Sequence, residues 1–65
     1  MQLTINGETK QIGSHTIQEL LIELGIEDKV MAAAVNMDVV KKDVWDSFQL
    51  NENDRVEFLQ FVGGG

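Results

Sequence analysis

Three glycines end the chain, Gly63, Gly64 and Gly65, directly after the apolar run from Val56 to Val62. Because glycine has no Cβ, such a terminus adopts almost any backbone conformation and fits a channel too narrow for side chains. Three extended residues reach about 10 Å, far enough to enter a concave catalytic pocket. We therefore expect the Gly65 carboxylate to react inside the active site of another protein. The alternative is an inert, frayed chain end.

Few other groups in the chain are suited to catalysis or metal binding. The sequence has no cysteine, which excludes a thiol nucleophile, a thiolate zinc site and a disulfide. The one histidine, His15, precedes Thr16 and has no serine or cysteine partner in view, so a surface role is favoured over that of a general base. The acidic pairs at 27–28 and at Glu52 and Asp54 lack the spacing of a calcium loop. We predict no catalytic residue, no metal site and no enzyme activity for this chain alone.

Length and charge limit the remaining function classes. A chain of 65 residues, 43% hydrophobic and 25% charged, forms at most one small domain with little room for an internal cleft. Its formal charge of −6 repels phosphate backbones, so nucleic acid is not expected as a partner, whereas a basic protein surface is. The first residues, 1–5, show neither a signal peptide nor a membrane span, and we expect a cytoplasmic protein without membrane contact.

The N-terminal part is predicted to form a β-hairpin. Leu3 and Ile5 alternate with polar residues, as in a strand with one buried face. The pair Asn6-Gly7 then supplies the two positive φ angles of a type I′ turn. The chain should return in a second strand over residues 8–12.

A helix is predicted next, with a signal at each end. Thr16 and Glu19 form a capping box, in which the hydroxyl and the carboxylate can each accept a hydrogen bond from a free backbone N–H of the first turn. Gly25 has the position of a left-handed residue after the last turn, and Ile26 could contact Leu21 there. The apolar residues between these signals have the i, i+3, i+4, i+7 spacing of one helix face, and they are Ile17, Leu20, Leu21 and Leu24.

The second half of the chain reads as short strands joined by turns. We expect, in order, a strand over 30–35, a turn over 36–38, a short strand over 39–40, one helical turn over 43–48, a turn over 51–54 and a last strand over 55–61. Trp45 and Phe48 should close the end of the core, because a small domain can scarcely leave two large aromatic side chains exposed.

The last strand should present different residues on its two faces. Side chains alternate along a strand, so Val56 and Phe58 point one way while Glu57, Leu59 and Phe61 point the other. If the first pair meets the helix, the second set lies on the open face of the sheet and forms a docking patch for a partner. The alternative is a bulge or strand end that returns Phe61 to the core.

This order of elements predicts an α+β fold of the β-grasp type, in which a mixed sheet packs on one helix. We expect this domain to span residues 1–62 and to be followed by a flexible glycine tail over 63–65. The fold alone does not indicate a function.

Over essentially its whole length the chain resembles the ThiS family of ubiquitin-like sulfur carriers of thiamine biosynthesis. The resemblance lies in the order and spacing of short motifs, which are Asn6-Gly7, the run 16–21, the run 33–36, Val40 followed by Trp45, Asn53-Asp54, Gln60 and Gly64-Gly65. Two positions depart from the usual pattern. Lys41 stands near the place where the family often has proline, and Gly63 makes the approach to the tail richer in glycine.

The resemblance implies a cycle of carboxylate activation. A ThiF-type adenylating enzyme would use ATP and Mg²⁺ to join Gly65 to AMP, and a persulfide on a partner's cysteine would convert this acyl-adenylate to a thiocarboxylate. A thiazole synthase of the ThiG type would accept the sulfur. On this reading ATP and magnesium belong to the partners, this chain binds no cofactor, and it acts as a co-substrate.

Three other functions are considered. The small subunit of molybdopterin synthase uses the same terminal thiocarboxylate, but those chains resemble longer versions of this fold, whereas the segment between Phe48 and Asp54 is short. A passive binding module would use Leu59 and Phe61 and leave the tail idle. A ubiquitin-like protein modifier would join Gly65 to lysines, and a modifier that built chains on itself has four available, Lys10, Lys29, Lys41 and Lys42.

Overall fold

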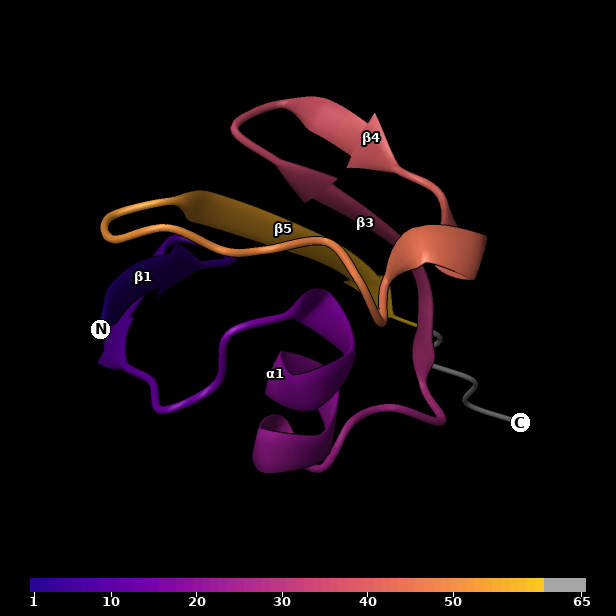
Figure 1. The fold of residues 1–65 in the computed structure, drawn as a ribbon, viewed down its shortest axis with the longest axis horizontal. Helices are drawn as coiled ribbons and strands as arrows, with labels where there is room; N and C mark the ends of the chain where they lie inside the picture. Colours follow the sequence, from indigo (N-terminus) through magenta and orange to yellow (C-terminus); the bar gives the residue numbers. More distant parts are fainter. Residues whose placement is uncertain (61–65) are drawn as a thin grey trace.

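The structure is a computed structural model, and it describes residues 1–60. Its elements are β1 (Gln2–Ile5), β2 (Glu8–Gln11), α1 (Ile17–Leu24), β3 (Val30–Val35), β4 (Asp38–Val40), the 3₁₀ helix η1 (Lys42–Val44) and β5 (Arg55–Gln60). The strands form one sheet in the order β2-β1-β5-β3-β4. Strand β5 is parallel to β1 and antiparallel to β3, so the sheet is mixed. Helix α1 covers one face of it (Figure 1), which confirms the predicted β-grasp fold.

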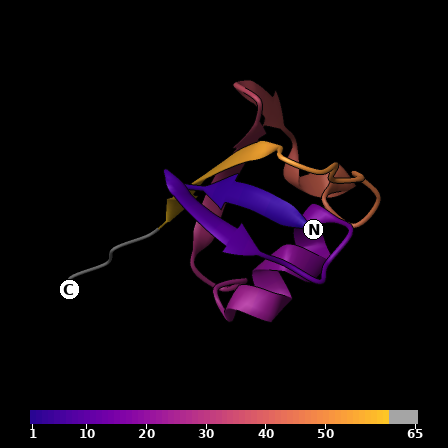
Figure 2. The same ribbon diagram turned by 90° about the vertical axis from the view of Figure 1, so that its left-hand side faces the viewer.

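The other face of the sheet carries no helix within residues 1–60. A view turned by 90° shows α1 on one side of the sheet and none on the opposite side (Figure 2). No helix in this part of the chain is long and apolar enough to span a membrane. The predicted glycine tail, 63–65, lies outside the described residues.

Both hairpins turn through paired left-handed residues. Asn6 has a φ of 48° and Gly7 of 85°, which confirms the turn predicted between β1 and β2. The β3–β4 hairpin turns in the same way, at Asn36 with a φ of 51° and Met37 with a φ of 75°. Strand β4 therefore begins at Asp38, one residue earlier than predicted, because two residues suffice for the turn.

The start of α1 follows the predicted capping pattern with one difference. The Thr16 hydroxyl accepts a hydrogen bond of 3.1 Å from the backbone N–H of Glu19. The Glu19 carboxylate accepts one of 2.8 Å from the backbone N–H of His15, which precedes the cap residue instead of lying in the first turn. The side chain of Glu19 thus fixes the chain entering the helix. The role of the imidazole of His15 stays a prediction.

The helix ends where the sequence indicates. Gly25 has a φ of 70°, and its N–H donates to the carbonyl oxygen of Ile22 at 3.0 Å. The N–H of Ile26 donates to the carbonyl oxygen of Leu21, also at 3.0 Å. These bonds satisfy two of the carbonyl groups that a helix end leaves free.

The core lies between α1 and the covered face of the sheet. Val56 and Phe58 of β5 are 0% and 7% exposed, and they join the buried stripe of the helix, which comprises Ile17, Leu20 and Leu21. Each such side chain stabilises the fold by about 1.5–3 kcal/mol when fully buried. One contiguous cluster therefore holds helix and sheet together.

The aromatic plug is confirmed for Trp45, which is 2% exposed. Its indole N–H donates a hydrogen bond of 2.8 Å to the carbonyl oxygen of Val40. Phe48 is only partly buried and packs against the core cluster. The preceding helical turn, η1, starts at Lys42, and the N–H of Phe48 donates to the carbonyl oxygen of Val44 at 2.9 Å.

Two asparagines fix β5 in its place. The side-chain oxygen of Asn36 accepts a hydrogen bond of 3.0 Å from the N–H of Arg55, and the N–H of Asn36 donates to the carbonyl oxygen of Arg55 at 2.7 Å. The amide of Asn36 also donates to the carboxylate of Asp54 at 3.0 Å. Further along β5, the side-chain oxygen of Asn6 accepts a hydrogen bond of 2.8 Å from the N–H of Phe58. Turn residues thus extend the short ladder between β1 and β5.

The loop before α1 is held by a carboxylate on the helix. Glu23 accepts a hydrogen bond from the hydroxyl of Ser14 and another, of 3.3 Å, from the backbone N–H of Gly13. The bond from Ser14 is the main cause that lowers the pKa of Glu23, and the bond from Gly13 adds to it.

We predict that Ser14→Ala raises the pKa of Glu23 toward its ordinary value of about 4.3. Because the folded-state pKa lies below the unfolded one, this interaction stabilises the fold above the unfolded value and is lost as the pH falls through the folded value. The melting temperature of the variant should therefore lie below that of the wild type near neutral pH, and the gap should narrow in acid below about pH 4. An NMR titration of Glu23 and melts across this range test the prediction. The control is Ser47→Ala, which removes a hydroxyl that donates to the carbonyl oxygen of Val44. If the melting temperatures of both variants depended on pH in the same way, the prediction would be contradicted.

Candidate functional site

In the sequence, the predicted reacting group, which is the Gly65 carboxylate, follows strand β5. This strand occupies the centre of the sheet and ends at Gln60, which pairs with Val30 of β3. The predicted tail residues Gly63, Gly64 and Gly65, and Phe61 of the predicted docking patch, lie outside the described residues. The structure therefore describes the strand that precedes the tail in the sequence.

The predicted alternation along β5 is confirmed for its described residues. Glu57 and Leu59 point away from the helix, and the side chain of Leu59 is 62% exposed. A bulge does occur nearby, but it lies in β3, where the pairing shifts between Val30 and Ala32. The extra residue is Met31, whose side chain is exposed. Because the bulge is in the neighbouring strand, β5 keeps its two faces distinct up to Leu59.

Leu59 forms one wall of a shallow apolar groove on the open face. The groove has a volume of about 310 Å³, and its outward-facing lining comprises Ala32 and Ala34 of β3, Val39 of β4, and Glu57 and Leu59 of β5. Ala32 pairs with Leu59, and Ala34 lies between Glu57 and Val39. The alanines are small, so Leu59 and the exposed Val39 stand above them as the two sides.

We call this feature the open-face groove. The sequence indicated Glu57 and Leu59 but not the residues from β3 and β4. The signal for them was present in the two alternate alanines of β3, whose short side chains leave a hollow wherever larger neighbours flank them. An exposed apolar hollow of this kind is typical of a surface that contacts another protein.

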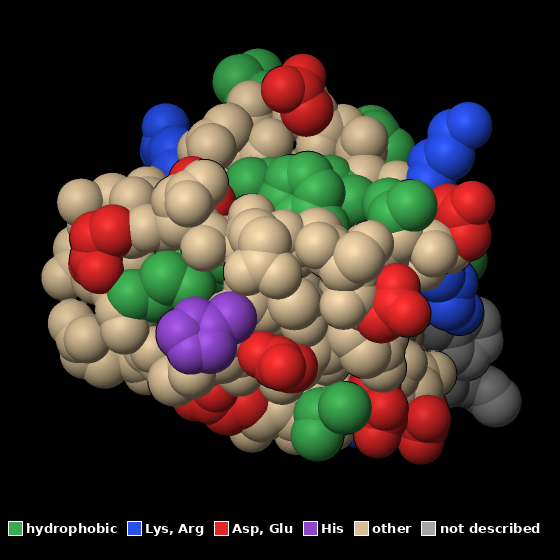
Figure 3. All heavy atoms as spheres, viewed as in Figure 1, with side chains coloured by type: hydrophobic (Ala, Val, Ile, Leu, Met, Phe, Trp, Pro, Cys, Tyr) green, Lys and Arg blue, Asp and Glu red, His purple; other side chains and the backbone are tan. Residues whose placement is uncertain are grey.

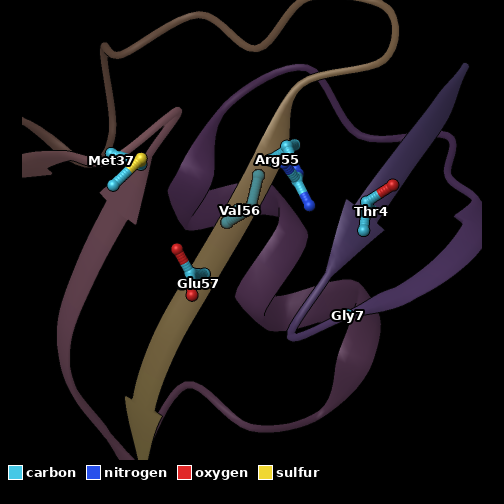
Figure 4. A pocket seen from close by; sticks show the side chains of 6 residues that line it. All are labelled: Thr4, Gly7, Met37, Arg55, Val56 and Glu57. Atoms are coloured by element: carbon cyan, nitrogen blue, oxygen red, sulfur yellow. The ribbon is translucent and has the colours of Figure 1, made fainter.

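A second hollow, of about 300 Å³, lies on the same face toward the start of β5. It is lined by Thr4, Gly7, Met37, Arg55, Val56 and Glu57 (Figure 4). The register pairs Thr4 of β1 with Arg55 of β5. This hollow could not be predicted from the sequence, because Thr4 and Arg55, which lie side by side in it, are about 50 positions apart in the chain.

Acidic side chains dominate the view that includes the helix. Figure 3 shows Asp and Glu spread over this face, whereas Lys and Arg lie near its margins. Within residues 1–60, no group of three or more side chains is placed to hold a metal ion.

Comparisons with known proteins agree with this geometry. The family model described as the ThiS family matches residues 3–65, which includes the glycine tail. A crystal structure of a thiamine biosynthesis protein (ThiS) from Geobacter metallireducens superposes with a TM-score of 0.80 at 33% identity, and all of both chains is covered.

Two curated relatives differ in length. The sulfur carrier protein ThiS of Bacillus subtilis is 34% identical over 50 residues, which cover 77% of this chain and 76% of that protein. A thiazole synthase of Paramagnetospirillum magneticum is 36% identical over 66 residues, which cover all of this chain but only 20% of that protein. The chain thus spans about a fifth of the thiazole synthases that it matches.

Proposed function

Because this chain belongs to the ThiS family, we propose that it is a sulfur carrier of thiamine biosynthesis and that the carboxylate of Gly65 carries the sulfur. The observation that supports this proposal most is the family match through residue 65, which places the three glycines within the shared sequence. The likeness to a ThiS structure over the full chain supports it independently.

The chemistry requires activation, since a carboxylate is a poor electrophile. We propose that a ThiF-type enzyme, with ATP and Mg²⁺, lets the Gly65 carboxylate oxygen attack the α-phosphorus and release pyrophosphate. The terminal sulfur of a partner's persulfide then attacks the acyl carbon, and AMP leaves. A second thiol of a partner attacks the cysteine sulfur of the resulting acyl disulfide and forms a disulfide with it, and the thiocarboxylate on Gly65 is the leaving group. All reactive groups except the terminal carboxylate belong to the partners, and this chain is a co-substrate, not an enzyme.

The open-face groove is our candidate for the surface that docks on these partners. It includes Leu59, so a partner that covers it also lies close to Gln60, the last described residue before the tail in the sequence. We propose that Leu59 and Phe61 supply apolar contact and that Glu57 supplies charge at the rim. The negative charge of the chain favours basic surroundings on the partner.

Thiazole synthase is the proposed acceptor of the sulfur. Relatives of that name contain a segment similar to the whole of this chain, which supports a working association between the two units. When the carrier and the synthase share one polypeptide, the covalent link keeps them close together. When they are separate proteins, binding at the groove would bring them together.

We predict that deletion of Gly65 abolishes sulfur transfer, to less than about 1% of the wild-type rate, because the shortened tail no longer reaches the reacting groups. A full-length chain whose terminus is converted to an amide should be equally inactive, since it keeps the length but lacks the carboxylate. Both should keep the wild-type melting temperature, because the buried core cluster of the described residues runs from Leu3 to Phe58 and Gly65 has no side chain to bury. Mass spectrometry after incubation with the adenylating enzyme, ATP and a persulfide donor gives the rate. A shortened chain that still accepts sulfur would refute the role of Gly65.

We also predict that Leu59→Glu weakens binding to the adenylating enzyme at least about tenfold, because it places a charge in an apolar contact. The free energy of unfolding should change by less than about 1 kcal/mol, since Leu59 makes no core contact. Phe58→Ala, in the next position of β5 but inward, is the contrast and should lose about 3–5 kcal/mol of stability. Calorimetric titration and denaturant unfolding measure the two effects. Wild-type affinity in the Leu59 variant would exclude the groove as a docking surface.

A further inference from the structure

Arg55 is the only arginine of the chain, and it stands on the open face at the start of β5. Its side chain extends from β5 toward β1 and Thr4, whereas the carboxylate of Glu57 lies on the opposite side of the strand, toward β3 (Figure 4). The hydrogen bonds of Arg55 within residues 1–60 come from its backbone, which contacts Asn36. The side chain of Arg55 is exposed, so a partner can reach its guanidinium donors.

The side of the hollow beside Arg55 has donors that can bind a small acidic group, whereas the carboxylate of Glu57 lines the side toward β3. The volume of the hollow is about 300 Å³, and Thr4 and Arg55 bring a hydroxyl and a guanidinium to one side of it. Gly7 forms another side, and a Cβ there would meet no atom within 4 Å, so the space is open. A guanidinium binds a carboxylate through two parallel hydrogen bonds, which fixes orientation as well as adding affinity.

Hydrogen bonds fix the backbone of Arg55 beside the hollow. Asn36 binds the N–H and the carbonyl of Arg55 and also the carboxylate of Asp54, which is itself buried. The N–H of Thr4 donates a hydrogen bond of 3.0 Å to the carbonyl oxygen of Asp54. These bonds set the position of Arg55 relative to β1 before any partner binds, which lowers the entropy cost of binding.

Met37 at the rim adds an independent observation. It occupies a left-handed position, with a φ of 75°, in a turn that favours glycine, and its side chain is 87% exposed. A large apolar residue at such a position is strained and gains nothing from the core. Backbone strain of this kind concentrates at functional sites, and Met37 borders the hollow that contains Arg55.

We infer that this hollow, which we call the Arg55 pocket, receives a carboxylate side chain of thiazole synthase, with Arg55 and Thr4 donating hydrogen bonds to it and Met37 covering it. This inference rests on the proposed function. Thiazole synthase is chosen because it is the enzyme that the comparisons connect with this sequence.

Charge and geometry give the pocket a distinct role in recognition. A chain of charge −6 favours basic surfaces on its partners. Arg55 reverses the charge at one exposed position, so we expect an acidic side chain opposite it on the partner. Arg55 and Gln60 are the two ends of β5, about 17 Å apart at the rise of a strand. A contact at the far end of β5 fixes the angle at which the tail enters the partner's active site.

The test is a calorimetric titration of thiazole synthase with four variants of the full chain. Arg55→Glu should weaken binding at least about tenfold, and Arg55→Lys should weaken it less, because an ammonium keeps the charge but not the paired donors. Lys29→Glu, the same charge change at an exposed position between α1 and β3, should change affinity less than about twofold. Met37→Gly should raise the melting temperature and still weaken binding. Replacing the matching Asp or Glu of the synthase with Arg should restore binding of Arg55→Glu.

Several results would overturn the Arg55 pocket. These are equal losses for Arg55→Glu and Lys29→Glu, a loss that appears only with the adenylating enzyme, and a failure of every Asp or Glu replacement on the synthase to restore binding. Formation of the thiocarboxylate on the wild-type chain is measured in parallel. If the wild-type chain accepts no sulfur, the proposed function is refuted. If the wild-type chain accepts sulfur and the Arg55→Glu variant binds the synthase as tightly as the wild type does, only the Arg55 pocket is refuted.

Discussion

The structure depends on one constraint, which is that a single helix of eight residues covers a sheet of five strands. One helix can bury one face, so the strands β1, β3 and β5 divide their side chains between a covered and an uncovered side, whereas the residues of the edge strand β2 are all exposed. At the centre, β5 meets this constraint by turning Val56 and Phe58 inward and Glu57 and Leu59 outward. The proposed docking surface is a consequence of this division, because the strands that complete the core leave apolar neighbours exposed on the other face.

Features with local causes could be predicted from the sequence. The turn at Asn6 and Gly7, the cap at Thr16 and the helix end at Gly25 each depend on residues a few positions apart, and the structure confirms all three. The burial of Trp45 followed from its size alone. The outward position of Leu59 followed from alternation, which is a property of the strand itself.

Features that depend on strand register could not be predicted in this way. The bulge at Met31, the pairing of Ala34 with Val39 and the approach of Thr4 to Arg55 require knowledge of which distant residues lie opposite one another. Register is set by the whole sheet. The sequence therefore indicated one wall of the open-face groove, and of the residues that line the Arg55 pocket it indicated Glu57 as a docking residue but not Arg55, Thr4 or Met37.

In the proposed function, the two ends of β5 have different roles, one in the reaction and the other in binding the partner. In the sequence, one end of the strand is followed by the tail with the carboxylate that we propose to react, and at the other end stands Arg55, whose backbone is held by hydrogen bonds. Between them the groove offers apolar contact of the kind that protein interfaces use at their centres. A carrier of this design needs no catalytic side chain, because its partners supply the reagents and its fold supplies position.

The central claim is that sulfur travels on Gly65, and the intact mass of the protein isolated gently from its own cells tests it most directly. The account predicts a population heavier by the difference between one sulfur and one oxygen atom, which disappears on alkylation and maps to Gly65. An unmodified mass accompanied by conjugates linked through lysine would contradict it and would indicate a protein modifier instead.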